Sequence, residues 1–171
     1  MRLILYACLV FMLGCSANTS EEHLKVKAIS NFADTLVNSL KASDANIYQH
    51  LWARSDDELV DIKGNPLLVN IPIKDEAPQK PDEIKARFRK EHGKLTAYLG
   101  EDISNLEILE TEYLIKNDPF AQQSRLFQFE LRVKLRNGVR SCLLVQPSCL
   151  MTRRGIVIGD YLTIIDPTNQ P

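Results

Sequence analysis

The sequence predicts an α+β fold, with N-terminal helices packed on one face of a curved antiparallel sheet. Up to about residue 99, apolar residues recur every three to five positions, which is the spacing of amphipathic helices. Beyond residue 106 they alternate with polar residues, as in half-buried strands. The pair Asn137-Gly138 between two such segments is the strongest short-range hairpin signal. Helices first and an antiparallel meander afterwards indicate an α+β roll.

Two helices are predicted before residue 55. The first follows the capping-box pattern of residues 19–22 and continues to about Lys41. A second, shorter helix is capped by Ser43 or Asp44. It buries an apolar face formed by Ile47, Tyr48, Leu51 and Trp52. Because the link between them is short, the two helices are expected to pack as a hairpin.

A weakly patterned segment, residues 55–81, separates these helices from the third. Residues 61–67 form a predicted turn, and prolines beyond it mark a polar surface loop. The third helix begins near Asp82 and ends at Gly100. A break at Gly93 is the alternative, because glycine costs a helix interior about 1 kcal/mol relative to alanine.

Four strands are predicted in the last third of the chain, at residues 106–116, 127–136, 139–146 and 156–165. The first changes phase between Ile108 and Leu109, which indicates a bulge. The second is apolar on one face and charged on the other. Turns at Asn137-Gly138 and at residues 153–155 join the later strands into a meander.

The order of these elements resembles the nuclear transport factor two-like, or cystatin-like, superfamily. A helix hairpin, a loop, a third helix and three or four long antiparallel strands span roughly Glu21 to Asp166. The resemblance implies one domain in which helices and sheet enclose a cone-shaped cavity. Enzymes of this superfamily often place an Asp or a His inside the cone, where burial moves its pKa toward use as a base. The likeness rests on element order and not on a motif, so it carries over no functional residue.

His50, Asp160 and Tyr161 are the residues that such a cavity would use. His50 lies beside the apolar face of the second helix, and the other two lie inside the last predicted strand. A surface carboxylate and a core histidine with satisfied hydrogen bonds are the simpler interpretation. The chain contains no nucleophile-elbow, zinc-protease or phosphate-loop motif, and its three histidines are scattered. We therefore predict no catalytic residue, metal or cofactor, and interpret residues 56–58 as a solvated acidic loop.

The N-terminus resembles a bacterial lipoprotein signal. After a positively charged start, residues 3–13 form an apolar run of about eleven residues, too short to span a bilayer, which needs roughly 20. The run ends at Gly14-Cys15, and this pattern resembles the lipobox, although Met12 and Leu13 depart from its usual residues. The alternative is an ordinary secretory signal that contains a cysteine.

The lipobox resemblance implies a cellular location. Residues 1–14 would be a signal peptide, Cys15 would carry the lipid on its sulfur, and residues 15–20 would form a short tether. Ser16 stands where an aspartate would retain the protein in the inner membrane, so the resemblance implies the outer membrane, with the domain facing the periplasm. Several acyl chains at one residue give stable anchoring.

Composition limits the remaining classes of function. The chain has 21 Lys and Arg residues against 22 Asp and Glu residues, so no global electric field recruits nucleic acid. No second apolar run is long enough to span a membrane. Residues 21–166 have the length of a single domain, followed by a tail of residues 167–171.

Cys142 and Cys149 are the two cysteines that remain once the signal is removed and Cys15 is lipidated. In an oxidising compartment they predict a disulfide. Residues 146–148 would then have to turn the chain, because on one straight strand the two would lie about 23 Å apart. The alternative is that both are small buried apolar residues.

Six basic side chains form the predicted feature most indicative of binding: Arg132, Lys134, Arg136, Arg140, Arg153 and Arg154. The first three share one side of their strand, and the others lie near the next turns. They would form a cationic patch for anionic lipid or an acidic partner, and the alternative is a solvated sheet face. The leading hypothesis is a non-enzymatic, membrane-tethered domain that binds a protein partner or an envelope component. The second hypothesis is a small-ligand-binding protein or enzyme that uses the cone-shaped cavity.

Overall fold

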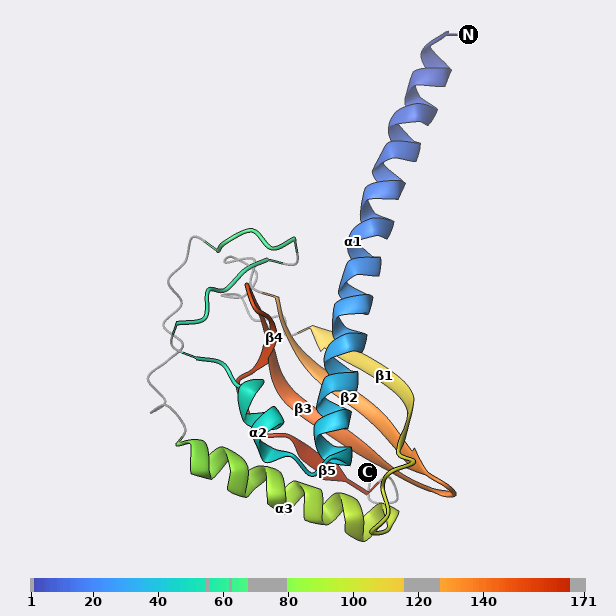
Figure 1. The fold of residues 1–171 in the computed structure, drawn as a ribbon. Helices are drawn as coiled ribbons and strands as arrows, with labels where there is room; N and C mark the ends of the chain where they lie inside the picture. The colour runs from blue at the N-terminus through green and yellow to red at the C-terminus, as the bar shows by residue number, and fades with distance from the viewer. Residues whose placement is uncertain (1, 55, 62, 68–79, 116–126, 167–171) are drawn as a thin grey trace.

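The computed structural model describes residues 2–54, 56–61, 63–67, 80–115 and 127–166, with side chains from Glu22 onward. Over these ranges the chain forms three helices and five strands: α1 (Arg2–Lys41), α2 (Ala45–His50), α3 (Pro81–Leu99), β1 (Glu107–Ile115), β2 (Gln128–Asn137), β3 (Arg140–Thr152), β4 (Gly155–Ile158) and β5 (Thr163–Ile165). The helices pack against a curved, open antiparallel sheet, so the predicted fold class is confirmed (Figure 1). Within the described ranges, no helix is both long enough and apolar enough to cross a membrane.

The sheet is built around β3. Its strand order is β1-β2-β3-β4, and β5 pairs with β3 as well. Residues 143–145 of β3 pair with β5, whereas residues 149–152 pair with β4. One long strand therefore pairs with two short strands along the same edge. All these pairs are antiparallel. Strand β1 therefore forms one margin of the sheet, and β2 and β3 form its centre.

Two sequence-predicted irregularities of the sheet are present. The register of β1 against β2 shifts between Ile108 and Glu110, which confirms the predicted bulge. The predicted hairpin between β2 and β3 is also present, but its loop is Gly138 and Val139, because Asn137 already pairs with Arg140. Gly138 adopts a φ of +61°, a left-handed conformation that glycine adopts without steric cost.

Helix α1 is longer than predicted. It begins at Arg2, so the expected start at residues 19–22 is wrong, and the expected tether of residues 15–20 is helical in this chain. No proline interrupts residues 2–41, and the apolar run before residue 15 continues the helix. Backbone N–H groups near residue 20 therefore find carbonyls four residues earlier and need no capping side chain.

The core lies between α1 and the inner face of the sheet. Buried α1 residues recur at helical spacing: Ile29, Phe32, Ala33, Leu36, Val37 and Leu40. They meet alternate residues of β2, namely Phe129, Leu131, Val133 and Leu135, all 0% exposed. Burying one such large apolar side chain contributes about 1.5–3 kcal/mol.

Helix α2 follows α1 after a short turn. The Asp44 carboxylate accepts hydrogen bonds from the backbone N–H groups of Asn46 (2.8 Å) and Ile47 (3.3 Å), as the predicted cap requires. The helix buries Ala45 and Tyr48. Ile47 was predicted to be buried, but it is 38% exposed, because the six-residue helix turns it away from the core.

Helix α3 is continuous through Gly93 and ends at Gly100, whose φ is +97°. Two of its polar side chains fasten it to its neighbours. The Glu91 carboxylate accepts a hydrogen bond from the backbone N–H of Ile164 in β5 (2.9 Å). The His92 ring nitrogen Nε2 lies 3.1 Å from the Leu40 carbonyl at the end of α1. These contacts join α3 to the sheet and to the first helix.

The chain between α2 and α3 runs along the end of the sheet. Trp52 bridges Ile158 of β4, and Leu59 bridges Thr152 of β3. The predicted turn is present, held by the Asp61 carboxylate, which accepts hydrogen bonds from backbone and side chain of residues 63–65. Most of the polar surface loop expected after it, and the predicted C-terminal tail, lie outside the described residues.

Candidate functional site

Side chains fill the layer between the helices and the sheet. Tyr48, Phe88 and Phe129 are exposed by 1% or less, and the rings of Tyr48 and Phe88 have centroids 5.0 Å apart. Aliphatic side chains with 0% exposure occupy the space around them: Leu36, Leu40, Leu95, Leu131, Leu135 and Leu144. In the part of the chain that the structure describes, this packing argues against the predicted cone-shaped cavity.

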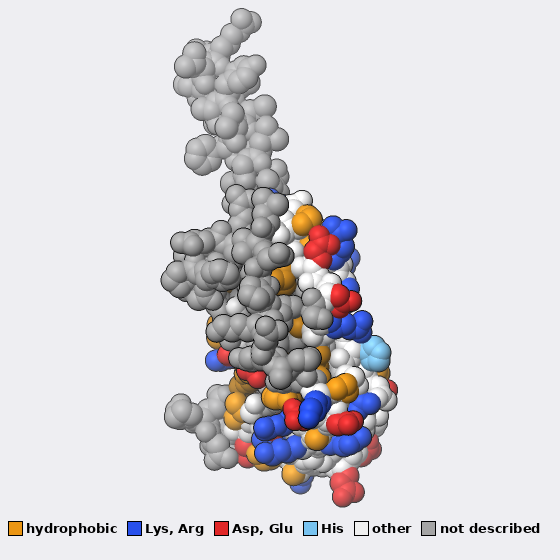
Figure 2. All heavy atoms as spheres, turned by 90° about the vertical axis from the view of Figure 1, so that its left-hand side faces the viewer, with side chains coloured by type: hydrophobic (Ala, Val, Ile, Leu, Met, Phe, Trp, Pro, Cys, Tyr) orange, Lys and Arg blue, Asp and Glu red, His pale blue; other side chains and the backbone are white. Residues whose placement is uncertain are grey.

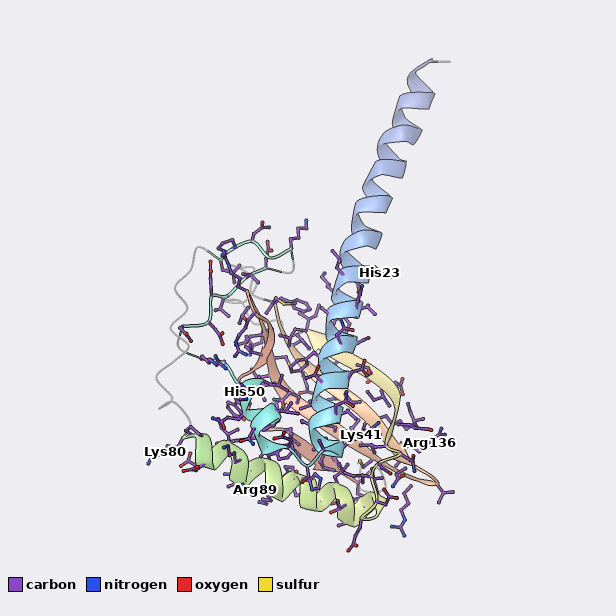
Figure 3. All side chains as sticks on the ribbon, in the orientation of Figure 1. His23, Lys41, His50, Lys80, Arg89 and Arg136 are labelled. Atoms are coloured by element: carbon purple, nitrogen blue, oxygen red, sulfur yellow. The ribbon has the colours of Figure 1, made fainter. Side chains whose placement is uncertain are left out.

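The three residues proposed for that cavity lie at the surface or at its edge. His50 is the exposed last residue of α2, and its Nδ1 lies 2.6 Å from the Asn46 carbonyl (Figure 3). Asp160 is exposed as well, and its carboxylate accepts a hydrogen bond from the Tyr161 N–H. The half-buried Tyr161 ring packs on Trp52 at a centroid distance of 5.0 Å. These positions do not support the hypothesis that all three residues line one cavity.

A break in the last strand explains the position of Asp160 and Tyr161. The predicted strand of residues 156–165 is divided into β4 and β5, and both residues lie in the connection between them. Gln146 holds this connection, because its side-chain amide donates a hydrogen bond to the Asp160 carbonyl (2.6 Å). The sequence pattern missed the break because β3 pairs with the two short strands at different positions along its length.

Cys142 and Cys149 do not form the predicted disulfide. Both are buried on the inner face of the same strand, β3, which bends at a register shift near Pro147 but does not reverse. Seven residues along a strand span about 23 Å, whereas disulfide-linked Cα atoms lie within about 7 Å. Burial, and then the negative charge of Asp166, raise the pKa of the Cys142 thiol to about 12. The two cysteines serve as small core residues.

An open depression of about 340 Å³ lies where the α1–α2 turn faces α3. Residues 42–46, Lys85 and Arg89 line it, and Figure 3 shows Arg89 on α3. The one carboxylate in it, Asp44, already caps α2. Across the described residues, no group of three or more metal-ligating side chains comes together, here or elsewhere.

The basic row of β2, which we define as Arg132, Lys134 and Arg136, lies on the outer face of the sheet, as predicted. The side chains between these residues, Leu131 and Val133, are 0% exposed on the opposite face. The row is not purely cationic, because a carboxylate lies against each of its two ends. Arg132 Nε lies 2.7 Å from Glu130, and Arg136 Nη2 lies 2.6 Å from Glu107 of β1.

Arg153 and Arg154 belong to a different cluster, at the β3–β4 turn. Arg154 binds both oxygens of Asp57 (2.5 and 2.9 Å), donates to the His50 carbonyl at 2.8 Å, and also donates to the Trp52 carbonyl. Arg153 forms an ion pair with Glu58 at 2.9 Å. Burial alone would raise the pKa of Asp57, but the hydrogen bonds and charge of Arg154, together with the hydrogen bond from the Arg54 backbone N–H, outweigh it and lower that pKa.

The Arg154 cluster, meaning Arg154, Asp57 and the carbonyls of His50 and Trp52, therefore joins α2, the following loop and the sheet. The six predicted basic residues therefore do not form one patch, because Arg154 is occupied within this cluster and Arg153, which is 67% exposed, pairs with Glu58 at the same turn. Arg140 is exposed at the far end of the sheet, beside Gly100. Figure 2 shows basic and acidic side chains interspersed on the face that it presents.

The feature that sequence reasoning missed is the acidic row of β1, which we define as Glu107, Glu110 and Glu112. In the pairing register these residues lie opposite Arg136, Lys134 and Arg132, respectively. The bulge separates Glu107 from the other two by an extra residue and hides the alternation in the sequence. Every residue of β1 is at least partly exposed, and Tyr113 joins it to α1 through a 2.7 Å hydrogen bond to Glu22.

The geometry thus contains a filled interior, an occupied Arg154 cluster and an exposed margin where an acidic row lies beside a basic row. Of these, only the margin leaves side chains and backbone open to a partner among the described residues. No known protein family, curated protein or solved structure matches this chain, so its function has to be inferred from this geometry.

Proposed function

We propose that the chain is a lipoprotein, anchored through Cys15 at the outer membrane, whose periplasmic domain binds a protein partner without catalysing a reaction. The observation that carries the binding proposal is the contrast between the filled layer under the helices and the exposed strand β1. A ligand or substrate would need an enclosed site, whereas a protein partner needs an accessible surface.

The course of α1 is compatible with an anchor at Cys15. The N-terminal part of α1 extends beyond the sheet (Figure 1). Glu22 is the first α1 residue with a hydrogen bond to the sheet among the described side chains. Seven residues of helix separate it from Cys15, a distance of about 10 Å along the axis. A lipid at Cys15 would thus hold the domain close to the membrane surface.

The charge arrangement favours a protein partner over an anionic lipid. Two residues of the basic row are already in ion pairs, and the acidic row lies directly beside it on β1. An anionic bilayer surface would meet carboxylates and guanidinium groups together, so the net attraction would be small. A protein can instead match both signs residue by residue.

The cavity hypothesis loses support, because His50 and Asp160 are exposed and the described side chains fill the layer between the helices and the sheet. Membership of the nuclear transport factor two-like superfamily stays a proposal, which the order of helices and strands supports. That fold accommodates enzymes and binding proteins alike, so it does not decide the function.

The anchor is tested by metabolic labelling with a fatty-acid probe, comparing the wild type with Cys15→Ala. We expect label in the wild type and membrane association that the variant loses. An unlabelled but fully processed wild type would show that the signal is an ordinary secretory one and would reject the anchor.

Partner binding is tested by a photo-cross-linking residue introduced in cells at Glu112 on β1, or at Lys90 on the exposed side of α3 as the matched control. We expect a discrete protein adduct from position 112 and none of that size from position 90. Adducts only from position 90, or no adduct from either, would contradict binding through the sheet margin.

A further inference from the structure

Strand β1 has the geometry of a free sheet edge. One edge pairs with β2 from Glu107 to Ile115, and no described residue pairs with the other. The bulge interrupts only the beginning of the strand, so Glu110–Ile115 keep a continuous register over six residues. Unpaired N–H and C=O groups along such an edge are a template for another strand. Strand addition is an established mode of protein–peptide recognition.

The outer face of this edge carries carboxylates that have no ion-pair partner among the described residues. Glu110 and Glu112 are exposed and point to the same side of the sheet. Neither carboxylate forms an ion pair within the described part of the chain, because Arg132, the register partner of Glu112, binds Glu130 instead. Both carboxylates are therefore available to basic groups arriving on the free side.

Apolar surface continues the pattern at the end of the strand. Leu114 follows Glu110 and Glu112 on the outer face and is 46% exposed, and Ile115 on the inner face is 48% exposed. A strand laid against β1 would cover both. The edge thus presents two acidic positions and then an apolar one, each two residues apart.

Building on the proposed function, we infer that β1 binds an extended segment of an envelope protein. In this segment an apolar residue and two Lys or Arg residues occupy every second position. The basic side chains face Glu110 and Glu112, and the apolar side chain faces Leu114. The segment joins the sheet as an additional antiparallel strand, which is the pairing used throughout this sheet.

Two other occupants fit less well. A second copy of this chain, pairing through its own β1, would set one acidic row against another, and like charges on neighbouring strands destabilise the pair. An anionic lipid surface would be repelled by the same carboxylates. Charge complementarity therefore selects a basic segment, and the acidic row also protects the edge from self-association.

The test uses the full-length protein in detergent and a fluorescent peptide, Leu-Val-Lys-Thr-Lys-Val, measured by anisotropy. We expect the variant Glu110→Lys/Glu112→Lys to bind it at least about tenfold more weakly, because like charges then face each other. The counterpart Leu-Val-Glu-Thr-Glu-Val should show the reverse order, binding the variant better than the wild type. The control variant Asp34→Lys/Glu101→Lys changes two exposed acidic residues elsewhere and should leave both affinities unchanged.

Two further measurements separate strand addition from simple charge attraction and from misfolding. A Lys peptide with alternate backbone amides N-methylated keeps its charges but cannot pair, so it should not bind. The milder variant Glu110→Gln/Glu112→Gln should also bind the Lys peptide more weakly while its melting curve matches the wild type. Equal binding of the methylated peptide, or an equal loss in the control variant, overturns the inference, as does a self-paired dimer or stronger capture on anionic than on neutral vesicles.

The outcomes also distinguish this inference from the proposed function. Fatty-acid labelling and a cross-linked partner at position 112, together with no peptide binding, would reject strand addition alone. If the wild-type protein carries no lipid but still binds the peptide, the anchor is rejected and the inference about the β1 edge is retained.

Discussion

Arg154 and Arg136, at the two ends of the sheet, were predicted to belong to one basic patch, but they differ in their partners and in their exposure to solvent. Arg154 at the β3–β4 turn binds a carboxylate and two backbone carbonyls, and its Asp57 partner has a side chain only 5% exposed. Arg136 on β2 has one partner, Glu107, and their side chains are 47% and 60% exposed, respectively. In the first pair the carboxylate is largely removed from water and the arginine is 31% exposed, whereas the second pair is solvated.

This difference shows why basic residues cannot be assigned to one binding patch from their spacing. A partly buried guanidinium with several acceptors fastens segments together, because removing it would leave those acceptors without a partner. An exposed pair in water contributes little to stability and stays accessible. The β3–β4 end is therefore structural, and the β1–β2 margin is where a partner can act.

The largest expected effect is the loss of the Arg154 cluster. We expect Arg154→Ala to lower the free energy of unfolding by about 3 kcal/mol, because the Asp57 carboxylate would remain buried without its cation. Urea denaturation measures this, with Arg154→Lys as the control that keeps a charge but not the bidentate geometry. A variant within about 0.5 kcal/mol of the wild type would show that the cluster is not structural.

Acid should weaken the same cluster. The pKa of Asp57 in the folded protein is lowered, so the stability that this group contributes is present above its unfolded pKa of about 4 and is lost as the pH falls through the folded value. Unfolding curves recorded from pH 6 downward should therefore show a steeper acid loss in the wild type than in Asp57→Asn. Parallel curves for the two proteins would contradict the assignment.

The pair Arg136–Glu107 should contribute much less. We expect each single change to alanine to cost less than about 1 kcal/mol, because both side chains are well solvated. Double-mutant cycles measure the two couplings directly, and Arg154–Asp57 should exceed Arg136–Glu107 several-fold. Equal couplings would remove the distinction between the two ends of the sheet.

Reduction should have the smallest effect. Because Cys142 and Cys149 lie far apart along one strand, we expect no change in melting temperature on adding a reductant. Alkylation after unfolding without reductant, followed by mass spectrometry, should find both residues modified. A species with the two sulfurs linked would mean that β3 can fold back near Pro147.

The fold class followed from the sequence because periodicity reports local geometry. Helical spacing located α2 and α3, and alternation located β2, since residues such as Leu131 and Val133 are buried on one face only. The pairing of strands that are far apart in the sequence could not be predicted in the same way. The division of the last strand depends on what β3 pairs with, and no local pattern records that.

The candidate site was predicted only in part, for the same reason. The alternation placed the basic row on its correct face, but its neutralisation depends on the register with β1, shifted by the bulge at Ile108. Asp57 stood out in the sequence merely as part of an acidic loop, and its burial against Arg154, 97 residues away, is a tertiary contact. The disulfide prediction erred because a proline bent a strand without turning it.

Amide hydrogen exchange of the full-length protein tests the central claim most directly, namely that the margin of the sheet is open while its centre is closed. We expect the amides of β2 and β3 to be strongly protected, whereas those β1 amides that point away from β2 should exchange as solvated groups do. Protection of all β1 amides to the same extent as β2 would contradict it, because that result would mean that the edge is already covered.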